Sequence, residues 1–295
     1  MKGKVQIITS MLIFGSISIF VRKIDLPSSV ISLLRGIIGS LFLYSFSMIT
    51  KKKISIQAIK DNLLLLLLSG AAMGFNWIFL FQAYKYTTVS NATLSYYFAP
   101  AIVMVLSPFL LKEKLSVKKS ICVIIAIIGL FMIVNTGNTV DGSNNHLVGI
   151  FYGLIAAFLY ASVILLNKFF KNLSGLEATL IQLVMSVIVL IPYVLIFEKP
   201  NLATFKMEFI PFILILGIVY TGISYLLYFS GMQKLKGQTI AVLSYIDPIT
   251  AVVISSVLLR ERMNIIQIIG GMLILGSSFL SEGTISSDEP VTEEL

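Results

Sequence analysis

Charged residues are scarce in this chain, because only 12% of its 295 residues are Asp, Glu, Lys or Arg. A typical soluble domain carries about 25%. Residues of the set AVILMFWYC make up 57% of the chain, more apolar material than a soluble fold of this length can use. The composition therefore predicts an integral membrane protein. A membrane helix takes about 20 residues plus a connection, so the chain has room for about ten crossings and no soluble domain.

The chain has one cysteine, Cys122, and one histidine, His146. A lone cysteine excludes a disulfide within the chain and a structural zinc site. No cluster of metal-ligating residues and no Gly-rich phosphate loop of the Walker type occurs in the sequence, so we expect no cofactor and no metal. The net charge of +8 would suggest nucleic acid in a soluble protein. Most Lys and Arg residues lie between apolar runs, so we attribute the charge to orientation in the bilayer and expect no nucleic-acid partner.

Ten apolar runs predict an all-α protein with ten transmembrane helices. They lie near residues 5–21, 29–49, 62–84, 88–111, 117–135, 147–168, 175–197, 208–233, 237–259 and 264–281. With the N-terminus in the cytoplasm, 14 of the 22 Lys and Arg residues fall inside, 7 fall outside, and Arg35 lies within a span. This bias places both termini in the cytoplasm. The first run could pass for a signal peptide, but Arg22 and Lys23 follow it where a cleavage site would stand.

The second half of the chain resembles the first. A shift of 148 residues lays Tyr97 on Tyr245, Pro100 on Pro248 and Gly74 on Gly222. The same shift lays Lys112-Glu113-Lys114-Leu115 on Arg260-Glu261-Arg262-Met263. Because each half holds five spans, the second must enter the membrane from the opposite side, which makes an inverted repeat. We expect one repeat over residues 1–140, the other over 141–282, and a disordered acidic tail over 283–295. Inverted repeats are typical of secondary transporters.

These motifs resemble those of the EamA-type transporters in the drug/metabolite transporter superfamily. The fourth span of each half contains a proline and ends in Leu-Lys-Glu-Lys-Leu or Leu-Arg-Glu-Arg-Met, and Asp247 stands before Pro248, where that family often has Glu-Pro. The resemblance covers about residues 5–281. It implies a central cavity between helices of both halves and export of amino acids, other metabolites or drugs.

Asp247 lies near the middle of the ninth span, where an acidic residue costs about 2.5–3.5 kcal/mol on insertion scales. Its counterpart in the first half is Ala99, so the repeat does not require an acid at this position. We interpret Asp247 as a ligand for a cationic group or as a proton carrier. The structural alternative is a buried acid held by a neighbouring Tyr or Arg, or by backbone groups freed near Pro248.

Arg35 is the other charge well inside a span, about six residues from the outer end of the second run. It could bind a carboxylate, pair with Asp247, or extend to the surface along its aliphatic stem. A cavity lined by both charges would suit a zwitterion such as an amino acid.

Amphipathic aromatic residues gather in the third, fourth, eighth and ninth spans. A cavity lined by rings with a few polar tips is typical of a small-molecule site, although packing or lipid contact explains any single ring as well. With Asn76 from the third span, the predicted lining is Asp247, Arg35, Asn76, Trp77, Tyr96, Tyr97, Tyr225 and Tyr245.

Pro100 and Pro248 each remove a helical hydrogen bond near the middle of paired spans. We expect them to be hinges, with a fixed kink as the alternative. Gln182, the counterpart of Arg35 at a shift of 147 residues, is expected to hydrogen-bond between helices. Ser174 and Glu177 have the spacing of a capping box. Glu113 and Glu261 are expected to form ion pairs that hold the halves together.

We therefore predict a secondary transporter, an exporter of small metabolites, with amino acids or related zwitterions as the first substrate class. The alternative is export of cationic drugs or other organic cations; a membrane-embedded enzyme and a passive channel are remote. We expect a multi-pass protein of a bacterial inner membrane whose partners are its small-molecule substrate and the bilayer. Proton coupling and a homodimer are left open.

Overall fold

The apolar runs form helices, because backbone N–H and C=O groups in hydrocarbon must find their hydrogen bonds within their own segment. The computed structural model describes residues 2–51, 55–112, 116–135, 146–198, 206–232, 234–235, 237–261 and 263–282. Within these ranges every regular element is helical and no strand occurs. The predicted acidic tail, and Glu113 with its neighbours Lys114 and Leu115, lie outside the described residues.

The elements follow one another along the chain with short connections. The first half contains α1 (Lys2–Gly15), α2 (Ile17–Val21), α3 (Ser28–Ile49), α4 (Ile56–Asp61), α5 (Leu63–Tyr86), α6 (Val89–Tyr96), α7 (Ala99–Leu110) and α8 (Val117–Asn135). The second half contains α9 (His146–Asn167), α10 (Gly175–Tyr193), η1 (Val194–Glu198), η3 (Met207–Phe209), α11 (Ile210–Gly217), η4 (Ile218–Ile223), α12 (Ser224–Met232), α13 (Gly237–Ser244), α14 (Ile246–Val257) and α15 (Ile265–Glu282).

Eight helical stretches among the described residues, from Lys2–Val21 to Met207–Met232, are long and apolar enough to cross a membrane. Two further apolar helices, Val242–Val257 and Ile265–Ser281, are shorter. The chain is therefore a multi-pass membrane protein with helices near all ten predicted runs.

Two predicted spans are interrupted at equivalent places. α6 ends at Tyr96 and α7 begins at Ala99, while α13 ends at Ser244 and α14 begins at Ile246. Each break comes a few residues before a proline, which has no N–H to continue the helical hydrogen bonds. The bends predicted at Pro100 and Pro248 are thus present, as breaks in the helix just before each ring.

The first predicted span is also broken, at a position where no proline predicts a break. α1 ends at Gly15 and α2 begins at Ile17. The hydroxyl of Ser16 donates to the carbonyl of Ile13 at 2.8 Å and lies 2.7 Å from the hydroxyl of Tyr220. A serine that hydrogen-bonds to the preceding turn competes with the helical backbone pattern, and here it also ties the break to η4.

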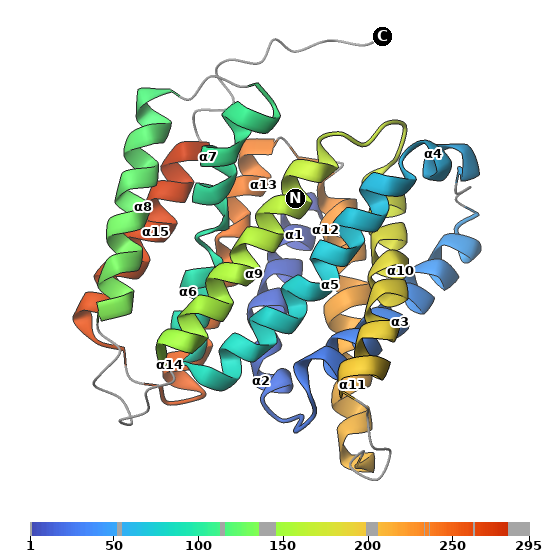
Figure 1. Ribbon diagram of the computed structural model, residues 1–295, viewed down its shortest axis with the longest axis horizontal. Coiled ribbons are helices and arrows are strands. Elements are labelled where there is room, and N and C mark those ends of the chain that lie inside the picture. The colour runs from blue at the N-terminus through green and yellow to red at the C-terminus, as the bar shows by residue number, and fades with distance from the viewer. Residues whose placement is uncertain are drawn as a thin grey trace.

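Helices from the two halves of the chain interleave (Figure 1). α5 packs against α9 and α10, and α1 packs against α12 and α14. α8 and α15 form a separate antiparallel pair at one side, where a side chain at Gly129 would meet the carbonyl oxygen of Gly270 at 2.5 Å. The start of α1 and the end of α15 both lie toward the upper side of Figure 1.

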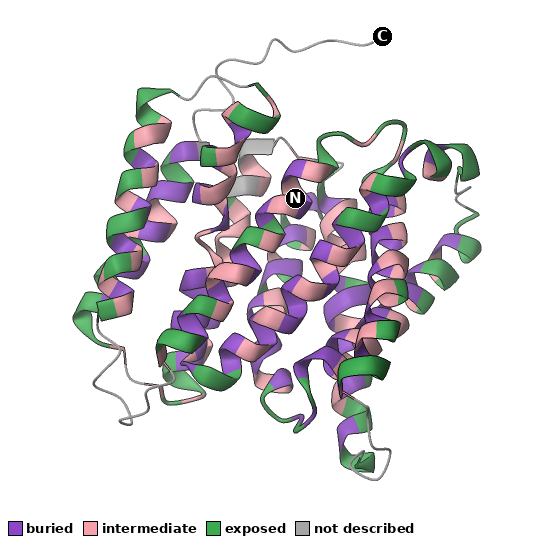
Figure 2. Ribbon diagram, viewed as in Figure 1, coloured by how far each residue is buried: buried purple, intermediate pink, exposed green. Residues whose placement is uncertain are grey.

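α8 shows how this fold reverses the pattern of a soluble helix. Three of its four buried residues, Cys122, Ala126 and Gly129, are small, and many of its large apolar residues are exposed, as the outer faces in Figure 2 show. Large exposed residues at helical spacing form a lipid-facing stripe. They are Ile121, Ile124, Ile127, Ile128 and Phe131, each at least half exposed.

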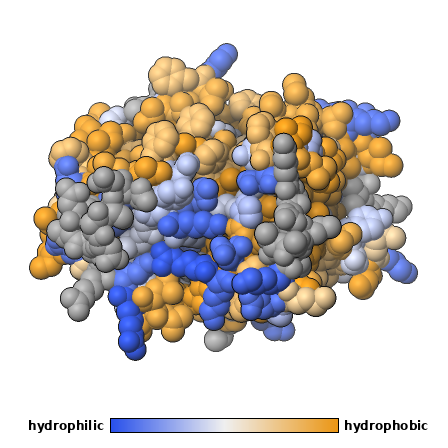
Figure 3. All heavy atoms as spheres, turned by 60° about the horizontal axis from the view of Figure 1, so that its bottom comes forward, coloured by the Kyte–Doolittle hydropathy of each residue, from blue (hydrophilic) through white to orange (hydrophobic). Residues whose placement is uncertain are grey.

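The ends of the bundle are polar. Figure 3 shows the end at which α2 and α14 finish, where a belt of hydrophilic side chains runs between hydrophobic flanks. Such a distribution fits a protein whose sides face hydrocarbon and whose ends face water.

Candidate functional site

A hydrogen bond joins the two interrupted helices near their breaks. The hydroxyl of Tyr97, directly after α6, donates to Oδ2 of Asp247 in the first turn of α14 at 2.5 Å. α6 also packs against α14. The structural alternative for Asp247 requires a neighbouring Tyr or Arg, and Tyr97 is such a neighbour. The pairing places the intramembrane acid where a helix from each half of the chain is interrupted.

The end of α1, where the first span is broken, packs tightly against the backbone of Asp247. A Cβ atom at Gly15 would lie 2.4 Å from the carbonyl oxygen of Asp247 and 2.6 Å from Cβ of Thr250. Only a glycine permits this approach of α1 to α14. The backbone that carries Asp247 is thus held directly against the end of α1.

Arg35 points into the bundle from α3. Its Nε donates to Oγ1 of Thr221 in η4 at 2.8 Å, and its guanidinium carbon lies 4.3 Å from the centre of a ring of Trp77. Only 4% of the residue is exposed. Of the three roles considered for Arg35, extension to the surface is contradicted by this burial.

Arg35 and Asp247 border the same set of tyrosines without forming a pair. The ion pairs among the described residues are Arg22–Glu261 and Lys206–Glu208, so direct pairing of Arg35 with Asp247 is also contradicted. Tyr84 and Tyr96 nevertheless lie within electrostatic range of both charges. These two tyrosines are therefore near both charges.

Several of these side chains lie deep in the protein and still keep accessible surface. Asp247, Tyr96, Tyr97 and Tyr225 are surrounded by protein atoms, yet each is only partly buried. Together with Arg35, these residues form the candidate site.

The other predicted residues divide into two groups. Trp77 supplies the ring over Arg35, and Tyr225 is the tyrosine with the strongest electrostatic contact to it. Asn76 donates from Nδ2 to the carbonyl of Ala156 on α9 at 2.6 Å, which joins α5 to α9, and its side chain also contacts Tyr96. Tyr245 instead packs its ring against Phe279 on α15, with centroids 5.6 Å apart.

Three residues at the site were not predicted. Thr221 accepts the hydrogen bond from Arg35, and the ring of Phe81 lies near the guanidinium group. Tyr84 lies within electrostatic range of both Arg35 and Asp247. Phe81 and Tyr84 follow Trp77 by four and seven residues, so helical spacing could have indicated them. Nothing in the sequence distinguishes Thr221 from other threonines in apolar runs.

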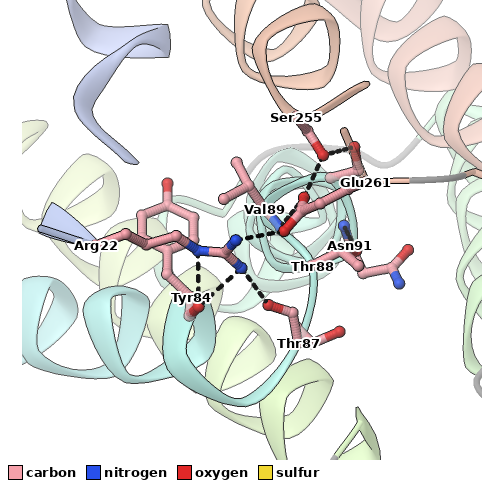
Figure 4. A network of polar contacts seen from close by, with 9 residues as sticks. Arg22, Tyr84, Thr87, Thr88, Val89, Asn91, Ser255 and Glu261 are labelled. Carbon is pink, nitrogen blue, oxygen red and sulfur yellow. Dashed lines mark hydrogen bonds and ion pairs between the residues drawn. The ribbon is translucent and has the colours of Figure 1, made fainter. Parts of the chain in front are cut away.

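A second polar network closes one end of the bundle (Figure 4). Nη1 of Arg22 pairs with Oε1 of Glu261 at 2.5 Å. Arg22 also donates to the carbonyls of Tyr84 and Thr87, and the other oxygen of Glu261 accepts from the backbone N–H of Val89 at 2.9 Å and from Ser255. The ion pair expected for Glu261 is confirmed, with Arg22 as its partner. It joins the loop after α2, the start of α6 and the loop after α14.

Two smaller predictions are also resolved. Ser174 and Glu177 form the expected capping box at the start of α10. Gln182 donates from Nε2 to Oδ1 of Asn167 at 2.6 Å and so links α10 to the end of α9, as expected. No cluster of three His, Cys, Asp or Glu residues suited to a metal occurs in the part of the chain that the structure describes.

Comparison with known proteins supplies the biological context. An "Uncharacterized transporter YxxF" of Bacillus subtilis (strain 168) is 30% identical over 277 residues, which are 94% of this chain and 88% of that protein. An "Uncharacterized transporter" of Archaeoglobus fulgidus is 26% identical over 95% of this chain and 96% of its own length. A "Probable amino-acid metabolite efflux pump" of Salmonella typhimurium is 26% identical over 75% of this chain and 77% of its own.

A solved crystal structure has a similar fold. It superposes with a TM-score of 0.63 at 17% sequence identity and covers 95% of this chain and 96% of its own. At this identity the likeness concerns the fold alone.

A family match covers nearly the whole chain. The EamA-like transporter family matches the chain twice, over residues 1–135 and 147–282, and these two segments correspond to the halves related by the shift of 148 residues. The family and the names of the relatives indicate a transporter of small metabolites rather than an enzyme. The chain therefore belongs to the EamA-like transporter family.

Proposed function

We propose that the chain is a secondary transporter that moves small zwitterionic metabolites, with amino acids as the first class, outward through a bacterial inner membrane. The observation that carries the proposal is the hydrogen bond between Tyr97 and Asp247. It places an intramembrane acid at two interrupted helices, one from each half, and interrupted helices form the substrate sites of many secondary transporters. The printed name of the Salmonella typhimurium relative, an amino-acid metabolite efflux pump, supports the substrate class.

The proposed architecture is ten spans in two inverted repeats, residues 1–140 and 141–282, with both termini in the cytoplasm. The packing pattern supports it, because contacts recur when the halves are exchanged. α9 packs against α6 and α7 much as α1 packs against α13 and α14, and α5 packs against α10 much as α11 packs against α3. Paired halves of this kind can rock around a fixed central site to give alternating access.

Organic cations are the second candidate substrates. Asp247 and the surrounding tyrosine rings favour them, because a carboxylate and ring faces both attract a cation. Arg35 argues against cations, since a like charge beside the site repels them.

Counterflow in proteoliposomes tests the proposal. Vesicles loaded with an unlabelled amino acid should accumulate the radiolabelled form transiently, and Asp247→Asn should reduce the initial rate at least tenfold. Asp61→Asn is the matched control, since Asp61 is an exposed acid that accepts a hydrogen bond from Gln57. Wild-type vesicles that show no counterflow with any amino acid, or a mutant with unchanged rates, would contradict the proposal.

A further inference from the structure

The guanidinium group of Arg35 is held in one orientation by η4. Its Nε donates to Oγ1 of Thr221 at 2.8 Å, and the same hydroxyl donates to the carbonyl of Leu216 at 3.0 Å. Because the hydroxyl proton is used by Leu216, its lone pairs face the arginine.

Aromatic rings fix the guanidinium plane as well. The ring of Trp77 lies 4.3 Å and the ring of Phe81 lies 5.7 Å from the guanidinium carbon. Rings attract a guanidinium group through its face. Arg35 is thus held along its Nε side by Thr221 and packed by rings, which leaves its terminal edge as the part free to bind.

Among the residues that the structure describes, the terminal edge has no hydrogen-bond partner. Arginine carries five N–H donors, and the one on Nε is the only one of Arg35 that makes a hydrogen bond among the described residues. No carboxylate of the described chain lies within 4.0 Å of it. Arg35 as a whole residue keeps 4% of its surface exposed.

A cation without an anion inside a membrane protein is costly, and such groups usually pair with each other or with substrate. Comparison of the two halves indicates that packing does not require a charge at the position of Arg35. The counterpart of Arg35 is Gln182, which lies between α10 and α9 as an uncharged amide bonded to Asn167. The charged member of this pair of positions is Arg35, in the half of the chain that also contains Trp77 and Phe81.

We propose that Nη1 and Nη2 of Arg35 bind the carboxylate group of the transported molecule. Two parallel N–H···O bonds match the planar carboxylate, and Tyr225 lies within electrostatic range of Arg35. The inference rests on the proposed function and sharpens it. The carboxylate binds at Arg35, the body of the substrate lies along Tyr84 and Tyr96, and a cationic group faces Asp247.

The test uses matched compounds on purified, detergent-solubilised protein. Thermal stabilisation is titrated with amino acids, with the amines that lack their carboxylate, and with the acids that lack their amino group. Leucine, isoamylamine and 4-methylpentanoate form one such set, and phenylalanine, phenethylamine and 3-phenylpropionate another. We expect the carboxylate compounds to stabilise the wild type and the amines to have at least tenfold weaker effects.

Variants then assign the effect to Arg35. Arg35→Gln should raise the half-maximal concentration of the stabilising carboxylate at least tenfold, and Arg35→Lys should recover only part of the affinity, since lysine cannot make the two parallel bonds. Arg260→Gln is the matched control, because Arg260 is an exposed arginine in the loop after α14. The proposal fails if amines stabilise as well as amino acids, if no carboxylate stabilises the wild type, or if Arg35→Gln binds normally.

Counterflow separates this failure from failure of the proposed function. Saturable counterflow of phenethylamine that is unchanged in Arg35→Gln would support the proposed transport and contradict a carboxylate site at Arg35. If carboxylates stabilise the wild type through Arg35 but show no counterflow, the carboxylate site is supported and the transport proposal is contradicted.

Discussion

At the scale of single residues, the two intramembrane charges occupy positions where the halves of the chain differ. Asp247 corresponds to Ala99, and Arg35 corresponds to Gln182. Neither counterpart is charged, so the two halves of the sequence differ in charge at these positions. Their contacts with Tyr97, Thr221 and Trp77 suit groups that are held ready for a ligand rather than neutralised by the protein.

Asp247→Asn should abolish transport driven by a pH gradient, because the amide cannot take up or release the proton. The measurement is uptake into proteoliposomes with and without an imposed gradient, with Asp61→Asn as the control. A pH dependence in Asp247→Asn equal to that of the wild type would refute a proton-carrying role and leave the residue as a substrate ligand.

At the scale of helices, the important features are the breaks and the glycines that let helices meet there. α1, α6 and α13 each end near the candidate site, and each break leaves backbone groups outside the regular helical pattern. Glycines do not all matter equally in this fold. Gly15 lies against the backbone of Asp247, whereas nothing lies within 4 Å of a Cβ atom at Gly276.

Gly15→Ala should therefore destabilise the protein by about 1–3 kcal/mol, as overpacking does in other tight contacts, and it should slow transport by moving α14. Gly276→Ala is the control, since its methyl group meets no neighbour and alanine favours a helix. Thermal unfolding in detergent measures both. Equal effects of the two substitutions would show that the contact of α1 with α14 is unimportant.

At the scale of the whole molecule, the network around Arg22 and Glu261 is where the halves are joined at one end (Figure 4). Glu261 accepts the ion pair from Arg22 and the backbone N–H of Val89. One side chain thus holds three segments together. The opposite end is joined differently, since Asn62 exchanges two hydrogen bonds with the backbone of Lys171.

Glu261→Gln should open the end of the bundle near Val89, because hydrogen bonds to a charged group contribute about 1.5–3 kcal/mol and the amide is uncharged. In a Cys122→Ser background, Val89→Cys should react several times faster with a membrane-impermeant maleimide when Glu261→Gln is added. The control is Glu208→Gln, whose ion pair with Lys206 is exposed. Unchanged labelling would mean that the network does not hold this end closed.

The proposed topology makes a separate prediction. Reporter fusions after residue 51 and after residue 295 should give fluorescent green fluorescent protein and inactive alkaline phosphatase, while a fusion after residue 198 should give the reverse. The positive-inside bias is the reason. Active phosphatase at residue 295 would overturn the cytoplasmic placement of the C-terminus.

The sequence alone determined the membrane class, the helical content and the approximate spans, and its constant shift predicted the repeat. These depend on hydrophobic composition, on helical length and on a constant shift, and all three are local or periodic properties of the chain. It also indicated Asp247, Arg35 and the prolines, because charge and proline are rare and costly within apolar runs.

The partners of these residues were decided by the tertiary structure. Tyr97 and Asp247 lie 150 residues apart, and Arg35 and Thr221 lie 186 residues apart. Tyr245 matched the pattern as well as Tyr97 did, yet it packs against Phe279. Which side chains meet depends on how helices cross and rotate against one another. That geometry is set by close packing at positions such as Gly15, where a single methyl group would change it.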